Sequence, residues 1–142
     1  GRGCLGRPWL FKDLVGSLHG EDRKVTPTLK EVSQVMYRHA ELIVDYFESE
    51  ERGCRDLRKH MAWYLKGFRV NSELRRQFGM VASLAELGSL LNQLEDQPYP
   101  VEVSEKPRGR TSHGRPPTLP DGWLKDPDEM IHLAAEDMFS GG

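Results

Sequence analysis

The sequence predicts an all-α fold, a small helical bundle followed by a proline-rich tail. Apolar residues recur at helical spacing as far as about residue 97, and no segment alternates between polar and apolar residues as a half-buried strand does. Two Ser/Thr-x-x-Glu sequences mark helix starts. The predicted loops are short, which favours antiparallel neighbouring helices.

The first predicted helix spans residues 8–18. Pro8 suits the first turn of a helix, where its missing N–H costs nothing. The apolar residues at helical spacing are Trp9, Leu10, Leu14, Val15 and Leu18.

The second predicted helix begins at the capping box of Thr28 and Glu31 and runs to about Phe47. Residues 48–53, ESEERG, end it. Its apolar face consists of Val32, Val35, Met36, His39, Ile43, Tyr46 and Phe47. We expect this face to be buried, with His39 as a hydrogen-bonded core histidine rather than a metal ligand.

Three further helices are predicted at residues 53–68, from Asn71 or Ser72 to Phe78, and at residues 83–94. The last of them starts with a second capping box, formed by Ser83 and Glu86. The apolar face of the helix at 53–68 consists of Cys54, Leu57, Met61, Tyr64, Leu65 and Phe68.

The chain changes character at Pro98, because seven of its nine prolines lie from there on. Residues 106–122 have too few apolar side chains to offset the entropy of ordering them. We therefore divide the chain into residues 1–27, a helical domain at 28–97 and a flexible tail at 98–142. A short amphipathic helix is possible at residues 128–138.

Composition limits the classes of protein to which this chain can belong. The 142 residues, 30% charged and 37% hydrophobic with net charge −2, fit a soluble globular protein. Two distant cysteines form neither a disulfide framework nor a zinc motif. No membrane-spanning stretch or signal peptide is apparent. We expect a cytoplasmic monomer without metal.

The window from residue 52 to residue 76 is strongly basic. It holds eight Lys or Arg and two acids, giving +6 in a chain of net charge −2. Local positive charge of this kind is typical of phosphate-backbone binding. The candidate RNA-binding residues are Arg55, Arg58, Lys59, His60, Lys66, Arg69, Arg75 and Arg76.

Four of these cations, Arg55, Lys59, Lys66 and Arg69, would form one stripe along a helix at 53–68. His60, Trp63 and Tyr64 could add stacking contacts with bases. The alternative interpretation is a solvated helix face with the aromatic rings in the core.

Glycines at the start of the chain form a second candidate site. Gly1, Arg2 and Gly3 precede the first predicted helix, where backbone N–H groups and a helix N-terminus attract phosphate. The alternative is a flexible start. No paired carboxylates, nucleophile elbow or Walker loop appear, and we expect Cys54 to be a buried core residue.

Three segments in order resemble bacterial tRNA-dihydrouridine synthases. GRGCLGRPWLF at residues 1–11 resembles their Gly-Arg…Gly-Arg-Pro-Trp segment, and RKHMAWYLKGF at 58–68 their Arg-Lys-His…Trp-Tyr-Leu segment. NSELRRQF at 71–78 resembles the Asn…Arg-Arg-Phe stretch that follows. The resemblance covers about residues 1–95.

The resemblance implies an eight-stranded β/α barrel that holds FMN, followed by a helical tRNA-binding domain. In that family NADPH reduces the flavin, which delivers hydride to C6 of a tRNA uridine, and a cysteine protonates C5. Gly1, Arg2 and Gly3 would be the last contact with the FMN phosphate. Arg58, Lys59 and His60 would face RNA.

The departures from the family define what this chain lacks. The barrel strands and the Asn-Gly-Cys-Pro-type motif have no counterpart, and neither Cys4 nor Cys54 matches it. We therefore predict a C-terminal part, residues 1–27 being the end of the barrel and 28–97 the tRNA-binding domain, with no catalytic residue of its own. Alone it should be inactive and bind FMN poorly. The alternatives are a helical protein-interaction module, or an enzyme using His39 or His60 with Cys54.

Overall fold

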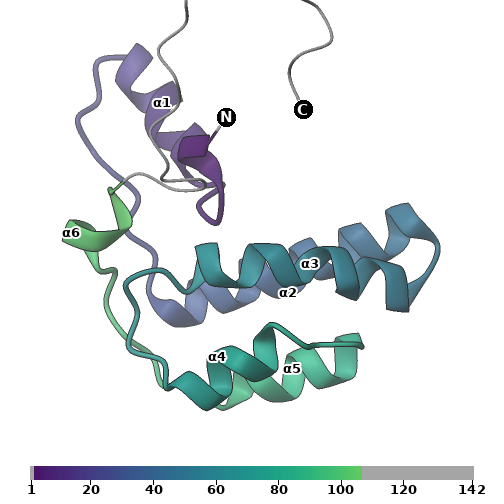
Figure 1. Ribbon diagram of the computed structural model, residues 1–142. Coiled ribbons are helices and arrows are strands. Elements are labelled where there is room, and N and C mark those ends of the chain that lie inside the picture. The colour runs from purple at the N-terminus through teal and green to yellow at the C-terminus, as the bar shows by residue number, and fades with distance from the viewer. Residues whose placement is uncertain (1, 107–142) are drawn as a thin grey trace, which may run out of the picture. The chain divides into compact units, whose positions relative to one another are not determined.

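The computed structural model describes residues 2–106 (Figure 1). Its elements are all helical, which confirms the all-α class for this part of the chain. They are the 3-10 helix η1 (Arg2–Cys4) and the α-helices α1 (Leu10–Leu18), α2 (Leu29–Phe47), α3 (Glu50–Tyr64), α4 (Ser72–Phe78), α5 (Leu84–Asn92) and α6 (Val101–Ser104). The helix predicted at residues 128–138 lies outside the described residues.

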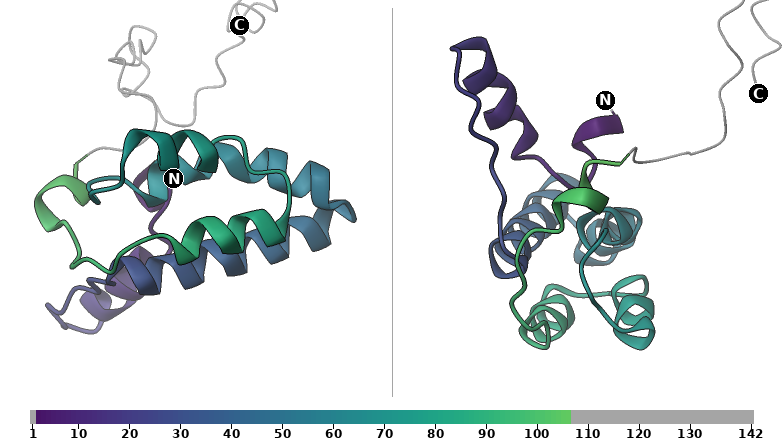
Figure 2. Two further views of the ribbon diagram at one scale, coloured as in Figure 1. Left: turned by 90° about the horizontal axis from the view of Figure 1, so that it is seen from below. Right: turned by 90° about the vertical axis from the view of Figure 1, so that its left-hand side faces the viewer.

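Four helices form the bundle. α2 and α3 are antiparallel neighbours with the most extensive contact, and α4 and α5 form a second antiparallel pair (Figures 1 and 2). α3 contacts α4 and α2 contacts α5, so the four helices surround one core. The core consists of Leu29, Val32, Met36, Ala40, Leu57, Met61, Tyr64, Leu65, Phe68, Leu74, Phe78, Val81, Leu87 and Leu90.

The sequence signals at both ends of α2 are confirmed. The Thr28 hydroxyl accepts a hydrogen bond from the Glu31 N–H, and the Glu31 carboxylate accepts one from the Thr28 N–H at 2.8 Å. The helix ends where Glu48 adopts a left-handed conformation, with φ 49°. Ser49 then caps α3 by accepting from the Arg52 N–H.

The predicted bounds of α3 were wrong at both ends, because the helix covers residues 50–64 rather than 53–68. After α3 the chain turns at Gly67, whose φ of 87° lies in the left-handed region that favours glycine. The Arg75 guanidinium stabilises this turn by donating to the carbonyl oxygens of Phe68 at 2.7 Å, Leu65 at 3.1 Å and Val70 at 3.1 Å.

Caps also fix the remaining two helices of the bundle. Asn71 caps α4 by accepting from the Leu74 N–H at 2.7 Å, as its position predicted. Ser83 caps α5, but the predicted capping box is incomplete. The Glu86 carboxylate accepts from the N–H of Ala82 at 2.8 Å, one residue before the N-cap.

The packed structure continues past Pro98. The Gln97 carbonyl oxygen accepts from the Leu29 N–H at 2.9 Å, which holds the start of this segment against α2. Tyr99 makes edge-to-face contacts with both Trp9 and Phe68. Ser104, at the end of α6, is fully buried. Tyr99 and Ser104 are therefore held against the rest of the chain despite the neighbouring prolines, whereas residues 101–103, 105 and 106 are exposed.

Helix α1 differs from the bundle helices because none of its residues is buried. Leu14, Val15 and Leu18 are 51%, 55% and 86% exposed, although their spacing predicts one buried face. Only Trp9, just before the helix, packs against the core. The amphipathic pattern of α1 therefore has no partner within the described residues.

Substitution by alanine should have opposite effects on stability at Gly53 and at Gly88. A Cβ at Gly53 would lie 2.7 Å from Cα of Val44, so α2 and α3 approach too closely there for any side chain. Gly53→Ala should lower the free energy of unfolding by about 1–3 kcal/mol through overpacking. A Cβ at Gly88 in α5 would meet only Tyr37, at an ordinary 3.6 Å.

Gly88→Ala should therefore stabilise the protein by about 0.5–1 kcal/mol, because alanine loses less backbone entropy in a helix. Urea denaturation of the two variants beside the unsubstituted chain measures both effects. Equal effects of the two substitutions would contradict the close approach of α2 and α3.

Candidate nucleic-acid interface

The basic residues do not form one continuous helical stripe. Arg55 and Lys59 lie on α3, but the helix ends at Tyr64, so Lys66 and Arg69 lie in the turn that follows. Arg76 lies on α4. The predicted stripe along one helix was wrong, and the cations are distributed over α3, the following turn and α4.

Two of the predicted RNA-binding arginines hold the fold together. The three main-chain contacts of Arg75 close the turn after α3, and Arg58 donates from Nε to the Val81 carbonyl oxygen at 2.9 Å. Both side chains are half-buried. Their charge adds to the local potential, whereas their position is set by the carbonyl groups they bind.

We define the basic surface as the exposed cations among the predicted RNA-binding residues, namely Arg55, Lys59, Arg69 and Arg76. Three of them pair with acids: Arg55 with Glu51 at 2.6 Å, Lys59 with Asp56 at 2.7 Å and Arg76 with Glu73 at 2.7 Å. Exposed pairs of this kind contribute little to stability, so a phosphate can replace the acid at small cost. Lys66 is half-buried, and its Nζ donates to the Lys106 carbonyl oxygen at 3.3 Å.

Glu73 is the strongest competitor for a phosphate on this surface. Hydrogen bonds from Arg76 and Gln77 lower the pKa of its carboxyl to about 2, so it stays charged at neutral pH. Arg76 would have to exchange this carboxylate for a phosphate in order to bind RNA. Arg69 is exposed, and its backbone N–H is bound to Gln97 at 2.8 Å, which holds the residue in place.

A cluster of rings lies beside Lys59 on the α2–α3 pair. His39 and His60 contact each other edge to face with centroids 4.8 Å apart, and His60 contacts Trp63 at 5.2 Å. The Tyr64 hydroxyl is hydrogen-bonded to Nδ1 of His39 at 3.0 Å. His39 is therefore half-buried and hydrogen-bonded, as its place on the apolar face predicted.

Burial keeps both imidazoles neutral. Desolvation is the main cause that lowers the pKa of His39, with Asp56 raising it and Lys59 lowering it further. Desolvation also lowers the pKa of His60, with His39 and Lys59 adding to the effect and Asp56 opposing it. Burial raises the pKa of Tyr64 to about 12. At neutral pH these rings offer hydrogen bonds but no charge.

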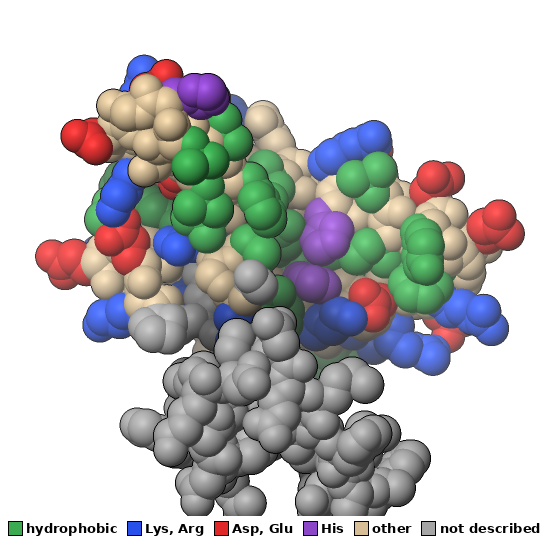
Figure 3. Space-filling view, turned by 90° about the horizontal axis from the view of Figure 1, so that it is seen from above, with side chains coloured by type: hydrophobic (Ala, Val, Ile, Leu, Met, Phe, Trp, Pro, Cys, Tyr) green, Lys and Arg blue, Asp and Glu red, His purple; other side chains and the backbone are tan. Residues whose placement is uncertain are grey.

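The ring cluster lines a mainly apolar hollow of about 650 Å³ between the N-terminal turn, α1, α2 and α3. The lining residues are Cys4, Leu5, Gly6, Pro8, Phe11, Glu31, Gln34, Val35, Arg38, His39, Leu42, His60 and Tyr64. On this face, histidine side chains lie among apolar ones, with Lys and Arg side chains nearby (Figure 3). The sequence did not reveal that Cys4 and His60, far apart in the chain, share one hollow.

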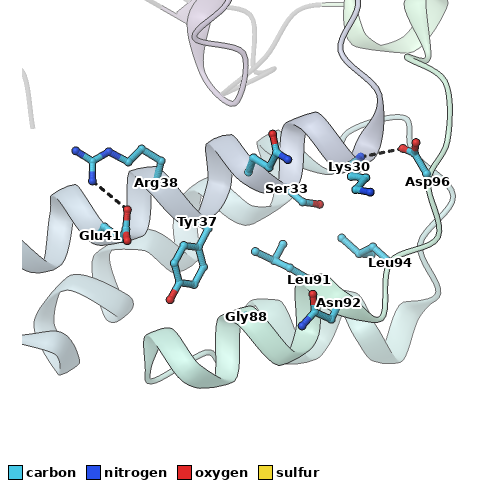
Figure 4. A pocket seen from close by; sticks show the side chains of 11 residues that line it. Lys30, Ser33, Tyr37, Arg38, Glu41, Gly88, Leu91, Asn92, Leu94 and Asp96 are labelled. Carbon is cyan, nitrogen blue, oxygen red and sulfur yellow. Dashed lines mark hydrogen bonds and ion pairs between the residues drawn. The ribbon is translucent and has the colours of Figure 1, made fainter.

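A second groove, of about 770 Å³, runs between α2 and α5 (Figure 4). Its wall contains Tyr37 and Leu91, and Arg38 is bound there to Glu41 at 3.0 Å. Asp96 accepts from the backbone N–H of Lys30 at 2.9 Å. The groove is lined by two exposed cations, Lys30 and Arg38, and two carboxylates, Glu41 and Asp96, so it has no excess of positive charge.

Cys54 lacks the exposure of a reactive thiol. Cys54 is fully buried, as predicted, and burial and nearby acids raise the pKa of its thiol. Residues 2–106 hold no group of three or more His, Cys, Asp or Glu placed to bind a metal ion. None of their helices combines the length and apolar character needed to cross a membrane.

The N-terminal turn contains two of the three predicted phosphate-binding residues, since Gly1 lies outside the described part. Arg2 and Gly3 are exposed in η1, and the Gly3 carbonyl oxygen accepts from Nε of Arg7 at 2.8 Å. Gly6 adopts a φ of 65°, and a Cβ there would overlap the carbonyl carbon of Trp63. This close approach holds the turn against the end of α3.

These features describe a helical bundle with a basic surface and a ring-lined hollow, and a basic surface is the charge distribution typical of nucleic-acid-binding proteins. The family profile described as dihydrouridine synthase (Dus) matches residues 1–102. The chain therefore belongs to the dihydrouridine synthase family.

Individual relatives agree with this assignment. A probable tRNA-dihydrouridine synthase of Mycobacterium leprae is 46% identical over 144 residues, covering 100% of this chain and 37% of the relative. Its counterpart in Mycobacterium tuberculosis is 45% identical over the whole chain. The tRNA-dihydrouridine synthase B of Pasteurella multocida is 35% identical over 61% of the chain and 26% of its own length. The chain thus spans just over a third of the mycobacterial relatives, and no solved structure matches it significantly.

The two buried histidines predict a pH dependence of stability. Their pKa values in the folded chain lie below the ordinary value of about 6.5. As pH falls below about 6.5, the unfolded chain takes up protons that the folded chain does not, so the free energy of unfolding should fall. The loss ends once pH passes below the lowered pKa values.

Urea denaturation of the chain at several pH values between about 5 and 7.5 measures this effect, beside a His39→Gln/His60→Gln variant. The variant should show a clearly weaker pH dependence across this range. His19→Gln, at the exposed end of α1, is the control and should leave the dependence unchanged. An unaltered slope in the double variant would contradict the burial of the neutral imidazoles.

Proposed function

We propose that this chain supplies the tRNA-binding helical domain of a tRNA-dihydrouridine synthase, which reduces uridine in tRNA to 5,6-dihydrouridine. The observation that carries the proposal is the charge of +6 between residues 52 and 76 in a member of this family whose net charge is −2. The names of the mycobacterial relatives support tRNA as the partner.

The proposed RNA contacts divide into two groups. Arg55, Lys59, Arg69 and Arg76 are exposed and bind phosphates directly, and Lys66 and His60 lie beside them. Arg58 and Arg75 contribute positive potential, because their guanidinium groups already bind main-chain carbonyl groups. The basic surface therefore positions tRNA by contacts with the tRNA phosphate backbone, and such contacts do not depend on the nucleotide sequence.

FMN, reduced by NADPH, would supply the hydride for this reaction. The residues of this chain that would reach its phosphate are Gly1, Arg2 and Gly3. The exposed guanidinium of Arg2 and the side-chain-free Gly3 in η1 fit such a contact. They would supply one part of a phosphate site, and we propose that the flavin ring and the catalytic cysteine belong to a β/α barrel preceding residue 1 in the whole enzyme. The isolated chain should then be inactive.

The exposed face of α1 favours a second role, contact with another protein surface. Leu14, Val15 and Leu18 present apolar side chains that nothing in residues 2–106 covers. Within the proposed enzyme this face packs against the barrel. As an independent protein-interaction module, the chain would use the same face without RNA. Cytoplasmic location and a monomeric state remain predictions.

Salt-dependent tRNA binding tests the proposal. We expect unmodified tRNA to bind the chain, with affinity falling steeply between about 50 and 200 mM salt as counterions are released. Lys59→Gln/Arg69→Gln should weaken binding and make the slope of log affinity against log salt shallower by about one for each lost phosphate contact. Fluorescence anisotropy with labelled tRNA measures both quantities.

Lys12→Gln is the control for loss of one surface charge, since Lys12 is an exposed cation on α1 and outside the basic surface. It should leave the affinity and the salt slope nearly unchanged. Weak binding that does not respond to salt, or an equal effect of Lys12→Gln, would overturn the assignment of RNA binding to this surface and favour the protein-interaction module.

A further inference from the structure

The hollow beside the ring cluster has the features of a binding site for a flat, partly polar ligand. Its volume of about 650 Å³ lies within the range of roughly 300–1,000 Å³ that is typical of small-ligand sites. Leu5, Phe11, Val35 and Leu42 give it apolar walls, and Gly6 lets the N-terminal turn approach α3 closely enough to form one side of this open hollow.

The rings at its wall suit stacking. His39 and His60 both line the hollow, and their edge-to-face contact, with planes at 70°, prevents the two rings from stacking on each other. Each imidazole is half-buried, so part of each ring remains accessible. Unstacked nucleobases in RNA complexes are commonly received by histidine and other aromatic side chains in this way.

The polar groups of the hollow provide hydrogen bonds without repelling a nucleotide. A neutral imidazole carries one donor and one acceptor nitrogen. Gln34 adds an amide at the wall. The one carboxylate among the lining residues, Glu31, is bound to the N–H of Thr28 in the capping box of α2.

Lys59 connects the hollow to the basic surface. Lys59 directly precedes His60 on α3, so it lies next to a residue that lines the hollow. Lys59 is held there by Asp56 in an exposed pair that a phosphate can replace. A nucleotide whose phosphate is bound by Lys59 would have its base beside the hollow.

We propose that this hollow binds one unstacked nucleobase of the tRNA whose backbone lies on the basic surface, an inference that rests on the proposed function. The ligand class is therefore a single-stranded nucleotide, with the base against His39 and His60 and the phosphate at Lys59. The hollow adds stacking contacts that the basic surface alone does not provide.

Two probes of equal charge test this inference on the 142-residue chain. One is a single-stranded RNA of about ten nucleotides of mixed sequence, and the other is an abasic phosphodiester oligomer of the same length. Each stacked base contributes about 1–3 kcal/mol, so the RNA should bind about 5- to 150-fold more tightly than the abasic oligomer. Binding of both probes is measured at one low salt concentration.

Variants then locate the base-dependent part of the affinity. Phe11→Ala/Leu42→Ala removes two lining side chains that are 60% and 50% exposed, so the bundle should still fold. This variant should lose most of the preference for the base-bearing probe and keep its affinity for the abasic one. Leu18→Ala/Tyr46→Ala, whose side chains are 86% and 82% exposed outside the hollow, is the matched control and should keep the preference. Circular dichroism confirms that each variant is folded.

The outcomes separate this inference from the proposed function. Equal, salt-dependent affinity for both probes would overturn the nucleobase site and leave the phosphate-binding surface intact. A preference that survives Phe11→Ala/Leu42→Ala, or that is lost in Leu18→Ala/Tyr46→Ala, would also overturn it, because the base would then bind elsewhere. Failure of both probes and of tRNA to bind would contradict the proposed function itself.

Discussion

The close approach of α2 and α3 at Gly53 is the constraint on which the rest of the structure depends. With no side chain at Gly53, the α3 backbone lies directly against Val44 of α2, and the two helices pack along their length. This contact brings His39 of α2 within 4.8 Å of His60 of α3. It also places the cations of α3 beside the ring-lined hollow. A side chain at Gly53 would therefore disturb the core and the candidate interface together.

The cations of the basic window fall into two groups: some stabilise the fold, and others form the proposed phosphate-binding surface. Arg58 and Arg75 hold the chain where α3 ends and where α4 gives way to α5, through bonds to main-chain carbonyl groups. The exposed cations around them are held by weak pairs with acids, which a phosphate can replace. The turn that carries Arg69 is held by hydrogen bonds within the chain, from Arg75 to Leu65 and Phe68 and from Arg69 to Gln97. A preformed surface of this kind loses little entropy on binding.

Local signals predicted most of the fold. Capping residues at Thr28, Asn71 and Ser83 located three helix starts, because a cap acts through hydrogen bonds within a few residues. Contacts between distant residues were not predictable in this way. The end of α3 depends on Arg75, and the position of Tyr99 depends on its contacts with Trp9 and Phe68. The hollow also joins residues 4–11 with residues of α2 and α3 that lie far along the chain, so its existence could not be inferred from spacing.

The central claim is that the basic surface and the ring-lined hollow contact tRNA, and histidine ring signals in ¹H–¹³C NMR spectra test it most directly. Addition of unmodified tRNA should shift the ring resonances of His39 and His60, because both lie beside Lys59 at the proposed contact. His19, at the exposed end of α1, should keep its resonance. Binding of tRNA that shifts His19 and leaves His39 and His60 unchanged would place the RNA on another face and contradict the account.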